Sequence, residues 1–233
     1  MLADLTWPEA GVRATAGAIL AVAIGATEQH GPHLPLSTDT DVATALCDRL
    51  AAARPEVLVG PAIPYGASGE HAGFPGTLSI GQAALELLVV ELCRSATDTF
   101  DRVLVVNWHG GNIEPLRRAR DLLRSESRDV RLYLPRFDGD PHAGRSETAL
   151  QLALAPERVR GDRAAAGDTR PLAELLPLLR AGGVRAVSAN GVLGDPSGAT
   201  AAEGTALLDH LSAELIDRTR LWWPENSPER TGT

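Results

Sequence analysis

The stretch Ile19-Leu-Ala-Val-Ala-Ile24 is apolar at every position and leads directly into the polar loop Gly25-Ala-Thr-Glu28-Gln-His30-Gly-Pro-His33. An unbroken apolar run that ends at a glycine is typical of a strand buried on both faces of a parallel sheet. Parallel α/β proteins place their functional groups in the loops that follow such strands. The stretch therefore predicts an α/β fold, together with the edge of the sheet at which a site should lie.

Short apolar runs continue to alternate with longer amphipathic segments along the chain. We expect three further strands, at 57–60, 102–106 and 130–134. Helices are predicted over 41–53, 82–99, 114–125, a short segment ending at 154, and 199–219. The segment 61–76 is predicted to be a long loop, whereas 164–198 gives no clear pattern. Repeated strand-loop-helix units predict a single-domain three-layer sandwich with a mostly parallel central sheet over 1–224, followed by a mobile tail at 225–233.

Length and composition exclude several classes of function. The chain has 233 residues, a net charge of −8 and no lysine, so every basic side chain except histidine is an arginine. A nucleic-acid binder would need a basic stripe, and none is present. No stretch approaches the roughly 20 apolar residues of a membrane span, which leads us to expect a cytoplasmic protein that binds no membrane. Cys47 and Cys93 lack the spacing of a disulfide framework, and we expect both to be buried as small apolar residues.

Histidines and carboxylates gather after the predicted strands. Five of the six histidines occupy such positions, and the sixth, His210, falls inside the last predicted helix. Because the carboxyl ends of parallel strands meet at one edge of a sheet, we expect these groups to converge. Imidazole and carboxylate together are the donors of a transition-metal site. The groups concerned are Glu28, His30, His33, Asp39, His71, His109, His142 and Glu147.

The residues of this set differ in how strongly the sequence supports them as metal ligands. Glu28 and His30 are two residues apart, so in an extended segment both side chains point to the same side. Asp39 has two oxygens, which suits a carboxylate that bridges cations about 3.5–4 Å apart. Asp41 competes with it for this role, but it also suits the N-cap of the following helix. His33 is more easily explained as a hydrogen-bonding loop residue.

Three motifs occur along the chain in this order: Glu28-x-His30-Gly-x-His33-Leu-Pro with Thr38-Asp39, Asn107-x-His109-Gly-Gly-Asn112, and His142-Ala-Gly-x-x-Glu147-Thr148. They resemble the signatures of the creatininase family of metal-dependent amidohydrolases. A fourth element, Glu70-His71-x-x-Phe74-Pro75-Gly76-Thr77, also matches. The resemblance implies that Glu28, His30, Asp39 and His109 are metal ligands and that Asp39 bridges.

The chain departs from creatininase at two positions. Gly111 stands where creatininase has a glutamate two residues after the matching histidine, and Pro141 stands where creatininase has a glutamate before the histidine that matches His142. The glycine at 111 leaves the metal site one ligand short. We expect Glu147 to supply the missing ligand, and its alternative role is that of a catalytic acid or base. Because of these departures, the proton relay of creatinine hydrolysis is not expected to operate in this protein.

The resemblance implies two divalent metal ions, most simply zinc, although iron or manganese suits the same donors. A divalent cation lowers the pKa of bound water from about 15.7 to about 7, which would allow metal-hydroxide attack on an amide. His142 is expected to stabilise the oxyanion or to protonate the leaving amine. His71 either lines the substrate channel or is structural.

The residues of the motifs most resemble those of a peptidase of this family, which releases a C-terminal dipeptide unit from a modified precursor peptide. Arg136, Arg145 and Trp108 are candidates to contact the end of such a peptide. One alternative substrate is a small cyclic amide or formamide, of the creatinine or formamidopyrimidine type. Another alternative is a non-enzymatic binding protein stabilised by a metal. The family also implies a homo-oligomer, in the form of a hexamer, and the segment Leu221-Trp222-Trp223-Pro224 would lie either at its interface or over its own core.

Overall fold

Four parallel strands form the centre of the computed structural model, which describes residues 1–136 and 139–224. Their order across the sheet is β2-β1-β3-β4, and β1 is paired with β3 along its whole length, from Ile19 opposite Arg102 to Ile24 opposite Asn107. The strands are β1 (Ile19–Ile24), β2 (Val57–Val59), β3 (Arg102–Asn107) and β4 (Asp129–Tyr133). All three strand pairs are parallel, as expected. The predicted mobile tail at 225–233 lies outside the described residues.

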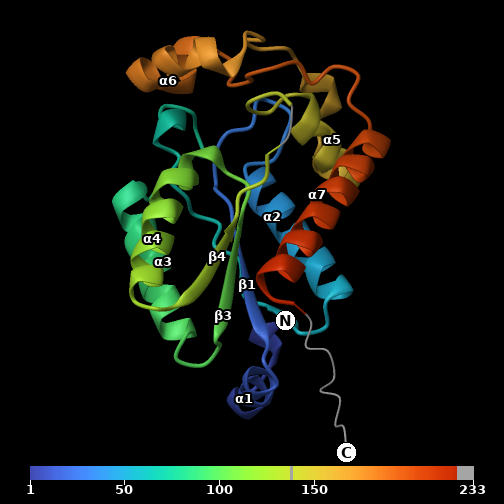
Figure 1. Cartoon of the computed structure of the whole chain (residues 1–233). Helices are drawn as coiled ribbons and strands as arrows, with labels where there is room; N and C mark the ends of the chain where they lie inside the picture. Colours follow the sequence, from blue (N-terminus) through green and yellow to red (C-terminus); the bar gives the residue numbers. More distant parts are fainter. Residues whose placement is uncertain (137–138, 225–233) are drawn as a thin grey trace, which may run out of the picture.

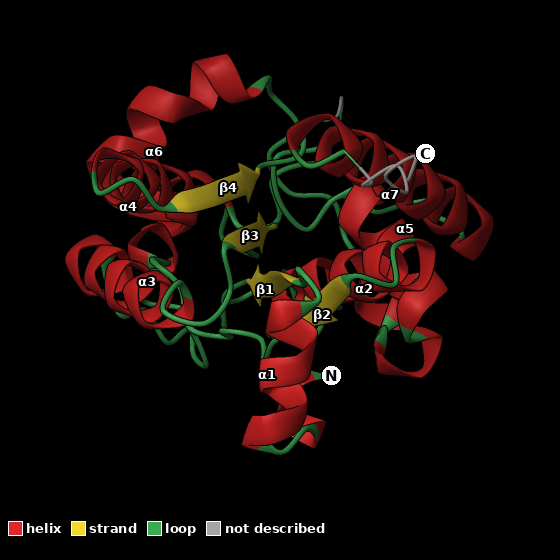
Figure 2. Cartoon of the chain, turned by 60° about the horizontal axis from the view of Figure 1, so that its bottom comes forward, coloured by secondary structure: helices red, strands yellow, loops and turns green. Residues whose placement is uncertain are grey.

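Helices cover both faces of this sheet (Figures 1 and 2). One face carries α2 (Thr38–Ala53), α5 (Arg145–Leu154) and α7 (Ala201–Trp222), and the other carries α3 (Gln82–Ala96) and α4 (Ile113–Ser125). Successive residues of β1 point to opposite faces, so Ile19 and Ala21 join the apolar cluster under α2 and α7, while Leu20 and Val22 join the one under α3 and α4. This arrangement confirms the three-layer α/β prediction.

Two helices were not predicted. The first, α1 (Trp7–Thr15), lies beyond the amino end of the sheet and buries none of its residues, although Thr6 and Glu9 form a capping box at its start. The second, α6 (Leu172–Val187), lies across the carboxyl end of the sheet, at the top of Figure 1. It contains Pro177, and Gly183 has a φ of 69°, which breaks the helical geometry near its end. Short 3-10 turns complete the elements: η1 (Leu2–Asp4), η2 (Gly69–His71), η3 (Gly110–Asn112), η4 (Pro156–Arg158) and η5 (Gly161–Arg163).

The role of Asp41 as an N-cap was predicted wrongly. Helix α2 begins three residues earlier, at Thr38, with Ser37 in the N-cap position. The carboxylate of Asp41 instead accepts hydrogen bonds from Ser37 Oγ at 2.9 Å and from Arg158 Nη1 at 2.9 Å. As a result, Asp39 lies in the first turn of a helix, where the helix dipole favours a negative charge.

The end of α7 is held against the core. Trp223 is buried, its indole N–H donates to Asp129 Oδ2 at 2.6 Å, and its carbonyl accepts a hydrogen bond from the buried Arg54 at 2.9 Å. Trp223 therefore covers its own core, whereas Leu221 is 82% exposed. Cys47 and Cys93 are buried and free, as expected. Over the described part of the chain, no helix combines the length and the apolar character needed to cross a membrane.

Candidate metal centre

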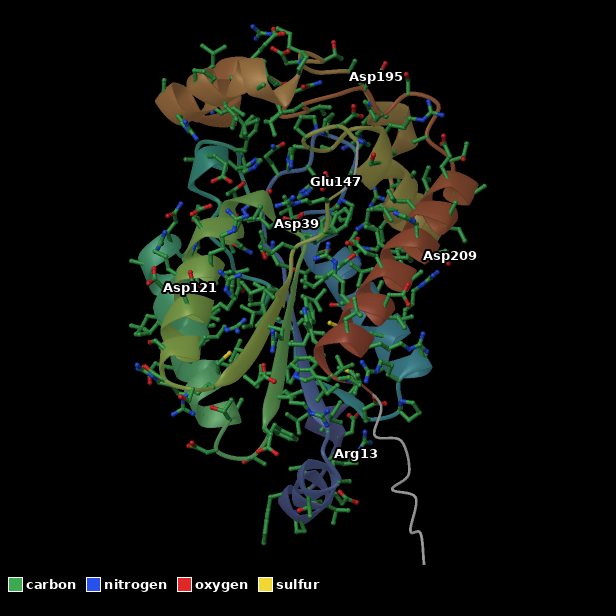
Figure 3. All side chains as sticks on the ribbon, in the orientation of Figure 1. Arg13, Asp39, Asp121, Glu147, Asp195 and Asp209 are labelled. Atoms are coloured by element: carbon green, nitrogen blue, oxygen red, sulfur yellow. The ribbon has the colours of Figure 1, made fainter. Side chains whose placement is uncertain are left out.

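The loops that follow the four strands bring the predicted site residues together at the carboxyl edge of the sheet. Figure 3 shows two of them, Asp39 and Glu147, on the inner side of the molecule near the upper ends of the strands. Seven of the predicted histidines and carboxylates are between 0% and 7% exposed, namely Glu28, His30, Asp39, His71, His109, His142 and Glu147. His210 is exposed on α7, away from this group, as expected for a residue without a role in the site.

One cluster is formed by Glu28, Asp39 and His109. The Nδ1 atom of His109 lies 3.2 Å from Glu28 Oε1 and 3.4 Å from Asp39 Oδ2. Its other ring nitrogen, Nε2, lies 3.1 Å from the carbonyl oxygen of Ala67, which can only accept a hydrogen bond. Nε2 therefore carries a proton in either state, and Nδ1 is the nitrogen that faces the two carboxylates and would be available to a cation. This is how proteins commonly orient a histidine that binds a metal.

A second cluster is formed by His30, Asp39 and Glu147. His30 Nε2 lies 3.3 Å from Asp39 Oδ1 and 3.8 Å from Glu147 Oε2. The Nδ1–H group of His30 donates to the carbonyl oxygen of Glu28 at 3.2 Å, so Nε2 is the nitrogen that faces the carboxylates and would be available to a cation. The two clusters share Asp39, whose Oδ1 faces one imidazole and whose Oδ2 faces the other. This is the geometry of a carboxylate placed to bridge two cations.

Several buried polar atoms in these clusters have no hydrogen-bond partner among the described residues. They are both carboxylate oxygens of Glu28, Nε2 of His30 and Oδ2 of Asp39. A buried polar atom without a partner costs about 1–3 kcal/mol, and more when it is charged. A divalent cation would satisfy these atoms together. The donors therefore fit a two-metal centre.

The electrostatics of the site support this interpretation. Burial opposes a charge on His30, yet Asp39 and Glu147 outweigh it and raise its pKa to about 10. Burial likewise opposes a charge on His109, and Glu28 and Asp39 raise its pKa to about 10. In spite of its own burial, Glu28 has a pKa well below the usual range because His109 faces it. Without a cation, both of these imidazoles are therefore protonated and face the buried carboxylates.

His142 and His71 lie beside Glu28 and are neutral. Burial lowers the pKa of His142, and it lowers the pKa of His71 to about 2. The Nε2–H group of His142 donates to the backbone carbonyl of Gln29 at 2.8 Å, which leaves its Nδ1 facing Glu28 Oε1 at 3.8 Å. The side-chain amide of Gln29 donates to Nδ1 of His71 at 2.8 Å, so the proton-bearing Nε2 of His71 faces the same carboxylate oxygen at 3.2 Å.

Glu147 is held in place from two sides. The indole N–H of Trp108 donates to its Oε1 at 3.0 Å, and the backbone N–H of Ala143 donates to its Oε2 at 2.6 Å. Trp108 is therefore buried against Glu147 instead of being displayed to a substrate. Arg145, another candidate for substrate contact, is paired with Glu203 at 2.6 Å on the surface. The third such candidate, Arg136, is exposed.

The side chain of Asn112 joins three of the loops, a role that the sequence motif did not reveal. Its amide group donates to the carbonyl oxygen of Gly25 at 2.9 Å and to Asn107 Oδ1 at 3.0 Å. Its Oδ1 accepts the backbone N–H of Ala67 at 2.8 Å. Because the carbonyl of Ala67 accepts from His109, Asn112 indirectly fixes the orientation of this imidazole. Asn112 and Gln29 were both missed because only tertiary contacts reveal their role.

His33 is buried beside the centre. Its Nε2 lies 2.8 Å from Thr148 Oγ1, which supports the expected role as a hydrogen-bonding loop residue. Burial lowers its pKa to about 4.

A cavity of about 810 Å³ opens over the centre. Its floor includes Glu28, His71, His109 and His142, and α6 forms part of its wall. Gly111 also lines it, and a Cβ atom at this position would overlap the carbonyl oxygen of Ala67 and lie 2.5 Å from Glu70 Oε1. The Glu70 carboxylate therefore occupies the space into which a side chain on residue 111 would project.

Known proteins resemble this chain in sequence and in structure. Residues 3–219 match the family model described as "Creatininase: Creatinine amidohydrolase". The mycofactocin precursor peptide peptidase of Mycolicibacterium smegmatis is 50% identical over 214 residues, which cover 88% of this chain and 86% of that protein. The creatinine amidohydrolase of Pseudomonas putida is 33% identical over 192 residues, which cover 69% of this chain and 74% of that protein.

Solved structures that share the fold of this chain include proteins described with bound metals. A structure described as "Creatininase Mn" gives a TM-score of 0.79 at 28% identity, covering 96% of this chain and 98% of that chain. A mutant creatininase of "Zn-Zn type" gives a TM-score of 0.80 at 27% identity, with the same coverage. Together with the donor clusters, these neighbours support a divalent-metal centre. The matched model, the relatives and the shared fold establish that this chain belongs to the creatininase family.

Proposed function

We propose that this protein is a metal-dependent peptidase that releases the C-terminal dipeptide unit from a modified mycofactocin precursor peptide by hydrolysing an amide bond. The observation that carries the proposal is the position of Asp39, whose two oxygens face the imidazoles of His30 and His109 and so link two clusters. The similarity to relatives named as mycofactocin precursor peptide peptidases supports the substrate.

The two clusters supply the ligands in this proposal. Glu28, Asp39 and His109 would hold one divalent cation, and His30, Asp39 and Glu147 would hold the other. Zinc is the first choice for mixed imidazole and carboxylate donors, and iron or manganese suits the same set. A divalent cation bound here supplies Lewis acidity and lowers the pKa of a water molecule from about 15.7 to about 7.

His142 would carry the proton. Its Nε2–H group is fixed on the carbonyl of Gln29, which leaves Nδ1 with a lone pair directed into the site. Because burial lowers its pKa, the imidazole is neutral near pH 7, the form that can accept a proton from the attacking water. The same nitrogen would then protonate the leaving amine. Glu147 is better suited to be a ligand than a proton carrier, since Trp108 and Ala143 fix both of its oxygens.

The size and character of the cavity favour a peptide over a small cyclic amide. At about 810 Å³ it falls in the range of pockets that enclose drug-sized ligands, and α6 contributes several leucines to its wall. A creatinine-like substrate is supported by the likeness to creatinine amidohydrolase, and it serves as the comparison in the test.

The test uses protein that has been stripped of metal with a chelator and then reloaded with zinc, manganese or iron. Mass spectrometry of the modified precursor peptide should show loss of the C-terminal dipeptide only after reloading. A His142→Ala variant should lose this cleavage while keeping its fold, whereas His210→Ala, which alters an exposed histidine outside the site, should cleave normally. Cleavage by the metal-free protein, or turnover of creatinine without turnover of the peptide, would refute the proposal.

The assembly and location of the protein remain predictions. The family resemblance implies a homo-oligomer, and Trp7 and Leu221, at 87% and 82% exposure, are apolar surfaces that an interface would cover. Analytical ultracentrifugation of the metal-loaded protein would measure the number of subunits.

A further inference from the structure

Two carboxylates line the cavity over the centre, and they belong to Glu28 and Glu70. Glu28 is a member of a donor cluster described above, whereas Glu70 is in none of the clusters found among the described residues. The side chain of Glu70 is 35% exposed and that of Glu28 is fully buried, so the Glu70 carboxylate reaches the open space of the cavity. Its place in the site therefore needs an explanation other than metal binding.

Glu70 is held in this place by the backbone around it. It lies in the turn η2, which is closed by a hydrogen bond from the N–H of His71 to the carbonyl of Ser68 at 3.0 Å. Two glycines make room for it. A Cβ atom on Gly111 would lie 2.5 Å from Glu70 Oε1, and a Cβ atom on Gly183 of α6 would lie 2.6 Å from the carbonyl oxygen of Glu70. The carboxylate is therefore fitted into a space that a larger residue would close.

The carboxylate of Glu70 keeps acceptor capacity for a ligand. Among the described residues, its single ionic neighbour is Nε2 of His109, at 3.6 Å. This distance is too long for a hydrogen bond, and the same nitrogen lies 3.1 Å from the carbonyl of Ala67, to which it donates its proton. An ionised carboxylate can only accept hydrogen bonds. The group that completes the site must therefore bring an N–H or O–H donor or a positive charge.

Hydrolysis of an amide produces such a group. The oxygen of water joins the carbonyl carbon, the C–N bond breaks with its electron pair on nitrogen, and both protons of the water end on that nitrogen. An amide with one N–H donor thus becomes an ammonium group, and the other product is a carboxylate. A carboxylate beside the nitrogen binds it more strongly as the bond breaks, which is the condition for an interaction to accelerate a reaction.

We propose that Glu70 is a catalytic residue whose carboxylate accepts the N–H of the amide that is cleaved and then binds the ammonium group of the departing unit. The inference rests on the proposed peptidase function, since it names the group that receives the leaving amine. In that proposal His142 delivers a proton to this nitrogen, and Glu70 stabilises the charge that results.

The kinetic test replaces Glu70 by glutamine, which has nearly the same shape but no charge. With zinc-loaded protein and the modified precursor peptide, Glu70→Gln should lower kcat about 100-fold and change KM by less than about threefold, because the contact strengthens as the bond breaks. Glu70→Asp keeps the charge on a shorter side chain and should retain more of kcat. The matched control, Glu114→Gln, alters an exposed carboxylate that pairs with Arg117 outside the cavity and should cleave at the parental rate.

A binding measurement tests the contact with the amine directly. The two products of cleavage are made by chemical synthesis and titrated in turn into zinc-loaded protein in a calorimeter. The unit with the new amine should bind Glu70→Gln about tenfold more weakly than it binds the parent protein, a ratio equivalent to about 1.4 kcal/mol. The shortened peptide with the new carboxylate should lose no affinity.

Zinc affinity separates this role from mere support of His109. If Glu70 acted by orienting that imidazole, Glu70→Gln would weaken zinc binding about 10–100-fold. We expect zinc affinity within about twofold of the parent protein, and a larger loss would overturn the proposal.

The remaining outcomes distinguish the amine site from the proposed function. If Glu70→Gln keeps the parental kcat, or if parent and variant bind the amine product equally well, the amine site is refuted even though the peptide is cleaved. If the amine product binds in a manner that depends on Glu70 but the parent protein cleaves no peptide, the amine site stands and the peptidase proposal fails.

Discussion

Replacement of Asn112 by alanine should weaken the metal centre without altering any of its proposed ligands. Asn112 is fully buried and makes three hydrogen bonds, to Gly25, Ala67 and Asn107, at 2.8–3.0 Å. The variant leaves each of these buried partners unsatisfied, at a cost of about 1–3 kcal/mol per group. After partial relaxation, we expect the free energy of unfolding to fall by about 3–5 kcal/mol, near the upper end for a point substitution.

The effect on metal binding follows from the same contacts. The carbonyl of Ala67 accepts the Nε2–H of His109, so a displaced Ala67 loosens the imidazole whose Nδ1 faces Glu28 and Asp39. Loss of such a supporting hydrogen bond typically costs about 10–100-fold in metal affinity. Zinc affinity is measured by competition with a chelator, and stability is measured by urea unfolding.

A buried polar change elsewhere provides the control for Asn112. Ser212 is 6% exposed in α7 and donates to the carbonyl of Leu208 within its own helix. Ser212→Ala should cost about 1 kcal/mol or less and leave zinc affinity unchanged. If Asn112→Ala binds zinc within about twofold of the parent protein, the coupling through Ala67 is wrong, whatever its effect on stability.

Three further outcomes are expected. Asp39→Asn removes the shared carboxylate, so elemental analysis should find the content of divalent ions reduced from two per chain to one or fewer; a content of two would argue against bridging. In metal-free protein, the pKa values of His30 and His109 are raised from 6.5 to about 10. The contribution of these two histidines to stability is therefore complete below pH 6.5 and is lost as the pH rises toward 10. A melting temperature that stays constant across this range would contradict the assignment. Trp108→Phe keeps a buried ring but removes the N–H donor to Glu147, so zinc titration should show one of two sites weakened about tenfold, and two unchanged sites would exclude the orienting role.

The sequence predicted the sheet well because its strands are nearly continuous apolar runs. Ile19–Ile24 is buried along its entire length, and such a run between glycine-rich loops has few alternatives to a central strand. The convergence of the predicted site residues followed from the same logic, because each residue could be assigned to the loop after a particular strand. The start of α2 was predicted three residues late because Asp41 resembles an N-cap, whereas its carboxylate contacts Ser37 and Arg158.

Features that depend on tertiary contacts could not be predicted. Helix α1 buries no residue, so no core packing depends on it, and α6 contains Pro177, Gly182 and Gly183, which interrupt its helical pattern. Because the chain belongs to the creatininase family, the prediction of a metal-dependent hydrolase that acts on amide bonds is confirmed.

The close contact around Gly111 restricts how this protein can diverge from its relatives. A side chain on residue 111 would overlap the backbone of Ala67 and the carboxylate of Glu70, so it cannot be introduced without a local rearrangement. The loop that carries Ala67 is tied to Asn112. A side chain at residue 111 therefore requires a backbone shift, either of the segment that carries Ala67 or of the turn that carries Gly111.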